Sequence, residues 1–216
     1  TATPQTSAAS YSTSENFQYM LENLLYFDKT FGIHTFGATL LQSVQNYRAE
    51  SSSLSSSKII YDSSQWYNLS ANLNGTPDSY GTGFSENSLM SYMARFNYSL
   101  MDRYLITATG RFDGASVLAP GNKWDFFPSF ALAWKVQKEN FMQPLSWISE
   151  LKLRAGYGVV GNSAVGPYTT SGPLSQYKYV FGDVPAISYI PYNMPNPVLE
   201  WEKTAQTNIG IDYGFL

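Results

Sequence analysis

Few side chains in this sequence could carry out chemistry, and they are widely spaced. Cysteine is absent and His34 is the only histidine, so carboxylates are the only remaining metal ligands. His34 could serve as a general base, but it lies beside a predicted turn and no glycine-flanked serine is near it. We therefore expect His34 to be a solvated turn residue and the protein not to be an enzyme.

Two short motifs resemble ligand-binding sites. Residues 156–161 read GYGVVG, which matches the glycine spacing of dinucleotide-binding loops, but a loop follows where the pyrophosphate needs a helix N-terminus. We interpret these glycines as the end of a strand. Residues 113–116 (Asp-Gly-Ala-Ser) could offer oxygen atoms to calcium, yet they lack the acidic ligands of a complete loop site. We expect a turn there and no cofactor, with calcium as the one metal left open.

The elements that must position such residues are predicted by hydrophobic alternation with a period of two, which is typical of strands. In residues 103–113, Tyr104 and Ile106 share one side, whereas Thr107 and Arg111 share the other. Asn23 interrupts the apolar side of an earlier segment. The sequence predicts about seven strands, at 17–27, 33–44, 90–100, 103–113, 124–136, 151–159 and about 206–215.

Short and long connectors alternate between these strands. Residues 28–32 and 101–103 form tight turns, and 138–147 form a modest connector with one helical turn near Glu139. In an antiparallel sheet, this order places every short connector at one end. Transmembrane β-barrels have this asymmetry, with short periplasmic turns and long extracellular loops. The expected extracellular loops are about 49–84, 114–123 and 160–200.

The composition favours a surface that meets both hydrocarbon and water. Charged residues make up only 13% and aromatic residues 16%, and the net charge of -3 gives no reason to expect nucleic acid. Tryptophan or tyrosine brackets two strands, at Trp124 and Trp134 and at Trp201 and Tyr213, as in the aromatic girdles of membrane barrels. We therefore predict an all-β fold, an antiparallel transmembrane β-barrel segment, as one partial barrel domain over 1–216. A soluble β-sandwich is the alternative.

Among the charged residues in these strands, five that lie opposite the apolar side chains are candidate site residues. An Arg or Lys facing lipid costs about 2–4 kcal/mol, so all five are expected to face the barrel lumen. We expect them to pair with one another; contact with a plug or a passing solute is the alternative. The five are Arg95, Arg111, Asp113, Lys135 and Arg154. Pro128 also lies within a strand, and since it cannot donate a ladder hydrogen bond we expect a bulge there.

Four segments carry a resemblance to a known family: RFNYSLMDRYLITATGRFDGAS (95–116), NKWDFFPSFALAWKV (122–136), LKLRAGYGVVGN (151–162) and NPVLEWEKTAQTNIGIDYGFL (196–216). They resemble SusC/RagA-type TonB-dependent outer-membrane transporters. Val117-Leu118 departs from the family, which more often has an Arg-Phe step there. The resemblance implies a 22-stranded barrel closed by an N-terminal plug, of which this chain holds part of the C-terminal half and no plug.

The resemblance also implies a function. That function is import of an oligosaccharide or peptide across the outer membrane of a Gram-negative bacterium, energised through TonB and the plug, with a SusD-like surface lipoprotein as partner. A passive porin or a surface adhesin barrel remains the alternative. Exposed aromatic residues of the long loops are the candidates for substrate binding, because aromatic rings stack on sugars and pack on proteins. They are Trp66, Tyr67, Tyr177, Tyr179 and Tyr189.

Overall fold

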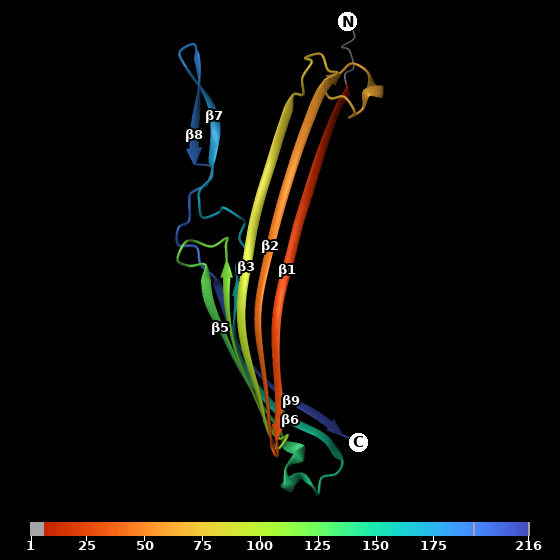
Figure 1. Ribbon diagram of the computed structural model, residues 1–216, viewed down its shortest axis with the longest axis vertical. Coiled ribbons are helices and arrows are strands. Elements are labelled where there is room, and N and C mark those ends of the chain that lie inside the picture. Colours follow the sequence, from red (N-terminus) through yellow and green to blue (C-terminus); the bar gives the residue numbers. More distant parts are fainter. Residues whose placement is uncertain (1–6, 192, 216) are drawn as a thin grey trace. The chain divides into compact units, whose positions relative to one another are not determined.

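The computed structural model describes residues 7–191 and 193–215 and is built mainly from antiparallel strands (Figure 1). The strands are β1 (Ser7–Phe31), β2 (His34–Ile59), β3 (Ser79–Leu100), β4 (Tyr104–Ala115), β5 (Trp124–Lys135), β6 (Ile148–Asn162), β7 (Leu174–Phe181), β8 (Val184–Pro191) and β9 (Glu202–Phe215). Three short 3₁₀ helices, η1 (Asp62–Ser64), η2 (Val136–Lys138) and η3 (Asn140–Met142), complete the described chain. Within that part of the chain, no helix has the length and apolar character needed to cross a bilayer.

The main sheet has seven strands in the order β1-β2-β3-β4-β5-β6-β9, as counted over the described residues. Each strand pairs with its sequence neighbour, and only the inserted β7–β8 hairpin interrupts that order before β9. The all-β antiparallel fold and all seven strands of the main sheet were predicted, and the structure confirms them. The helical turn near Glu139 is also confirmed, as η3.

Several predicted boundaries were wrong. β1, β2 and β3 contain 25, 26 and 22 residues, at least twice the ~9–11 residues that a tilted membrane strand requires. Both ends of the 49–84 segment are therefore strand, and the connector that remains is 60–78. The first tight turn lies at Gly32 and Ile33, at the end of the predicted 28–32, and Gly32 has a φ of 57° that suits glycine. The 160–200 segment contains the β7–β8 hairpin and is not irregular throughout.

Two compact units divide the chain, and strands β1 to β3 pass through both. The described part of the first unit comprises 7–19 and 46–87, a serine-rich sheet closed by the 60–78 connector. Asn72 orders this connector: its amide nitrogen donates to Ser56 Oγ and to the Thr76 carbonyl, each at 2.7 Å. Residues 20–45 and 88–215 belong to the second unit, which carries the remaining strands.

The register of the second unit sorts its side chains onto two faces. Tyr92 lies opposite Phe112, and Phe112 opposite Phe126, so aromatic residues from three strands share one face. Arg95 lies opposite Thr109, and Thr109 opposite Ser129, on the other face. We call these the apolar face and the polar face of the sheet. Residues 156–161, the GYGVVG motif, continue β6 and pair with β9, so they are strand as expected.

Pro128 does not produce the expected bulge. The β4–β5 register runs without a shift through Gly110 and Pro128. Pairing between β5 and β6 begins only at Ser129, opposite Gly158. Pro128 thus stands at the end of the β5–β6 ladder, where a missing N–H donor costs least.

The largest buried cluster of the second unit lies where the 116–123 connector meets the start of β9. Leu118 and Phe127 pack with Trp201, and the ring centroids of Phe127 and Trp201 are 5.2 Å apart. The Trp201 indole N–H donates to the Lys123 carbonyl at 2.9 Å. Trp201 is 7% exposed, so its assignment to a lipid girdle was wrong, whereas Tyr213 remains half exposed on β9.

Glycine at 114 is required by close packing on the apolar face. A Cβ atom there would lie 2.5 Å from two indole carbons of Trp124. Gly114→Ala should therefore lower the free energy of unfolding by about 1–3 kcal/mol, as overpacking does. Gly156→Ala is the matched control, because the nearest atom to its new Cβ would be 3.6 Å away. Heat-dependent unfolding of the two variants measures the difference, and equal stability would contradict the packing argument.

Candidate functional site

Several groups of charged side chains lie on the polar face, and one of them joins β3 to β4. Both carboxylate oxygens of Asp113 lie 2.8 Å from Arg111 Nε, and Arg111 Nη2 donates to Ser91 Oγ at 3.0 Å. Asp113 and Ser91 are buried, with exposures of 8% and 0%. The partner of the Asp113 carboxylate is thus a guanidinium. Among the described residues, no group of three acidic or histidine side chains could hold a metal ion.

A second group is a row of charges near the short connectors. Asp102 accepts from Lys135 Nζ at 2.6 Å and also pairs with Lys138. Asp212 pairs with Arg154 at 3.0 Å and with Lys152 at 3.4 Å. Lys135 and Lys152 lie directly opposite each other in the β5–β6 ladder, where like charges repel. Each of the two carboxylates, Asp102 and Asp212, pairs with two cations. The row therefore carries a net positive charge.

Arg95 differs from the other four predicted residues. Its Nε donates to Thr109 Oγ1 at 3.2 Å, its side chain is exposed, and it forms no ion pair within 7–191 and 193–215. All five predicted residues lie on the polar face, and four of them are paired. Whether that face lines a lumen stays a prediction.

The loop aromatics are divided between the two units. Trp66 and Tyr67 lie in the first unit, where Trp66 stacks on Tyr11 with ring centroids 5.1 Å apart. The other three lie on the β7–β8 hairpin. There Tyr177 and Tyr179 share one face, whereas Tyr189 pairs with Gln176 and points to the opposite face. Their role in substrate binding stays a prediction.

His34 and Glu139 have partners that the sequence did not predict. His34 is half-buried at the start of β2, with Nδ1 2.8 Å from the Tyr98 hydroxyl, so it is not a free turn residue. Glu139, between η2 and η3, accepts from the Tyr104 hydroxyl at 2.7 Å and from the Trp134 indole at 3.0 Å. These hydrogen bonds lower the pKa of Glu139, and Arg103 adds an ion pair at 3.2 Å.

An antiparallel sheet with an aromatic-rich apolar face and a charged polar face defines the wall of a membrane β-barrel. Comparison with known proteins then gives the family. All 216 residues match the family model for the TonB dependent receptor-like β-barrel. The chain belongs to this family, whose members are outer-membrane barrels.

Individual relatives agree with the family assignment. The chain is 43% identical over 140 residues to the TonB-dependent receptor SusC of Bacteroides thetaiotaomicron. This alignment covers 61% of this chain and 14% of SusC. It is 34% identical over 195 residues to the TonB-dependent receptor P26 of Formosa agariphila, covering 88% and 19%. Among solved structures, the RagAB peptide transporter aligns with a TM-score of 0.76 and 25% identity, covering 97% of this chain and 22% of that one. The chain thus spans about a seventh to a fifth of the length of these relatives.

The two arginines of the polar face should respond differently to mutation. Arg111→Gln leaves the buried carboxylate of Asp113 without its cation, which should destabilise the fold by about 1–3 kcal/mol. Arg95→Gln removes an exposed side chain without an ion pair in the described chain, and should change stability by less than about 0.5 kcal/mol. Denaturant unfolding of both variants checks this; a larger loss in Arg95→Gln would overturn the assignment.

Asp102 should make stability depend on pH in the acid range. Hydrogen bonds from Lys135 and then Lys138 lower the pKa of Asp102 from 3.8 to about 2. A carboxylate with a depressed folded pKa contributes stability above its unfolded pKa and loses it as the pH falls through the folded value. Wild type should therefore exceed Asp102→Asn slightly at neutral pH, because exposed pairs are weak, and the two should converge between pH ~4 and ~2. Unfolding curves across that range test the sign.

Proposed function

We propose that this chain forms part of the wall of an importer that takes up an oligosaccharide or a peptide across the outer membrane. The observation that carries the proposal is the two-faced sheet of a TonB-dependent receptor barrel. Its apolar face suits lipid, and its polar face holds charged residues in pairs, as a water-filled interior allows. The RagAB relative, described as a peptide transporter, aligns over 97% of this chain, which supports transport as the activity.

Energy for import would come through TonB acting on a plug that these residues do not include. The proposed orientation places the short turns in the periplasm and the 60–78, 116–123 and 163–201 connectors outside the cell. A Gram-negative outer membrane is the corresponding location. A SusD-like lipoprotein would cover the barrel from outside, and the relationship to SusC and RagAB supports such a partner.

The aromatic side chains of the long connectors are the proposed contacts for substrate or lid. Tyr177 and Tyr179 are about half exposed, and Tyr179 packs edge-on against Phe181 with centroids 5.0 Å apart. Such a surface can stack on a sugar ring or pack against a protein. Trp66 and Tyr67 of the first unit offer a similar surface.

Uptake by cells that carry the full-length protein tests the proposal. A labelled oligosaccharide pool and a labelled peptide pool are supplied to cells with and without functional TonB. We expect one pool to enter at least tenfold faster when TonB is present, and the pool that enters identifies the substrate class. Equal uptake without TonB would instead support a passive porin, and no uptake of either pool would support an adhesin.

The same uptake assay on Arg95→Gln tests whether the polar face takes part in transport. The variant retains the fold according to the stability argument above, so a severalfold fall in uptake would support contact between Arg95 and the plug or the solute. Wild-type uptake would show that Arg95 has no part in transport. Arg48→Gln is the matched control, because Arg48 already pairs with Glu50 in the first unit.

A further inference from the structure

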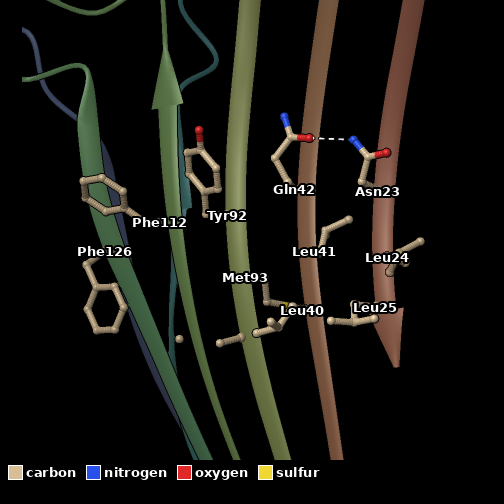
Figure 2. A pocket seen from close by; sticks show the side chains of 12 residues that line it. Asn23, Leu24, Leu25, Leu40, Leu41, Gln42, Tyr92, Met93, Phe112 and Phe126 are labelled. Carbon is tan, nitrogen blue, oxygen red and sulfur yellow. Dashed lines mark hydrogen bonds between the residues drawn. The ribbon is translucent and has the colours of Figure 1, made fainter. Parts of the chain in front are cut away.

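The apolar face of the second unit carries a groove with a polar upper end (Figure 2). It has a volume of about 540 Å³, within the range of ~300–1,000 Å³ found for small-ligand sites. Leucines from β1 and β2 form one side, at Leu25 and Leu40. Phe112 and Phe126 form the other side, with the Phe126 ring over Gly110, and Ala94 lines the floor. The groove is therefore long and apolar, and it opens to the side of the sheet.

Asn23 and Gln42 occupy the upper end of this groove. Asn23 Nδ2 donates to Gln42 Oε1 at 2.7 Å. The remaining groups, Asn23 Oδ1 and Gln42 Nε2, have no hydrogen-bond partner within the described chain. Figure 2 shows the two amides level with Tyr92, while Leu25 and Leu40 lie lower on the strands. Where this face meets lipid, the acyl chains cannot form hydrogen bonds with the acceptor Asn23 Oδ1 or the donor Gln42 Nε2.

The amide pair lies level with Tyr92 (Figure 2), and the strand register gives the spacing of the aromatic levels around it. Tyr104 lies opposite Trp134, and Gly114 opposite Trp124, so two aromatic levels are separated by ten residues of β4. At ~3.4 Å per residue and a tilt of ~40°, these levels stand roughly 26 Å apart, close to the ~25 Å apolar band of outer-membrane barrels. Trp124 stacks on Phe112 and on Tyr92, with centroids 5.0 and 6.2 Å apart. The amide pair therefore lies at the upper aromatic level, where the ester linkages of lipids are found.

We infer that this groove binds one acyl chain of a membrane lipid and that Gln42, held by Asn23, hydrogen-bonds the ester linkage of that chain. The chain would lie along Leu25, Leu40 and the ring of Phe126, all of which are about half exposed or more. The ester carbonyl oxygen at the head of the chain accepts from Gln42 Nε2, and the hydrogen bond from Asn23 Nδ2 to Gln42 Oε1 holds the Gln42 amide in place. The site depends only on the apolar face meeting lipid and is independent of import.

Native mass spectrometry of the delipidated full-length protein tests the site with three probes. These are a diacyl phosphatidylethanolamine, its diether analogue without carbonyl groups, and lipid A. Wild type should retain one ester lipid, and should hold the diether about fivefold more weakly, as expected for one lost neutral hydrogen bond. Preferential retention of lipid A assigns the site to the outer-leaflet glycolipid, and preference for the diacyl lipid assigns it to phospholipid.

Variants separate the groove from the rest of the apolar face. Asn23→Leu with Gln42→Leu should bind the diacyl lipid about fivefold more weakly and should no longer distinguish ester from ether. Thr207→Leu is the control, since Thr207 lies opposite Tyr157 on the apolar face but away from the groove, and it should bind as wild type.

Three results would overturn the inference. They are equal retention of ester and ether lipids by wild type, unchanged retention by the double variant, and a dimer without bound lipid that the double variant disrupts. The last would mean that a second copy covers the groove. If the double variant does not fold, the ester and ether comparison on wild type decides alone.

Discussion

The need to pair every backbone N–H and C=O group in hydrocarbon is the constraint on which this structure depends. The ladders from β3 through β9 meet it, with a shift only near Ile148 in their registers. Because side chains alternate along a strand, this continuous register also decides which residues meet lipid. A slip of one residue in β4 would turn Arg111 to lipid and Phe112 to the polar face. Both the charge pairs and the acyl groove are therefore consequences of backbone pairing.

Sequence patterns predicted the strands well where the two faces differ in polarity. Residues 103–113 and 124–136 alternate strongly, and β4 and β5 lie there. The prediction failed where the contrast disappears, as in the serine-rich 51–57 run, which reads as a loop yet continues β2. A strand in water can be polar on both faces, so its sequence does not alternate between apolar and polar residues and is not recognised as a strand. The hairpin at 174–191 was missed too, although Gly182-Asp183 between two β-rich runs is a turn signal that could have revealed it.

The candidate site was predicted by face but not by partner. Alternation placed Lys135 and Arg154 on the polar face, yet their carboxylates come from residues 102 and 212, which only the strand register brings close. Trp201 shows the opposite error. Trp201 precedes β9 and follows an irregular segment, so the alternation of side chains along β9 does not determine its direction. Its ring packs against Phe127. Periodicity cannot report contacts that depend on how a connector folds back.

Glu139 has a consequence for how two aromatic side chains of the wall meet the bilayer. Interfacial tyrosine and tryptophan normally direct their polar atoms to lipid headgroups and so respond to the headgroups around them. Here the hydroxyl of Tyr104 and the indole N–H of Trp134 are already bonded to a carboxylate of the protein itself. These anchors gain little from any particular headgroup. The positions of these two rings on the sheet are thus set by Glu139 and do not depend on the lipid headgroups around them.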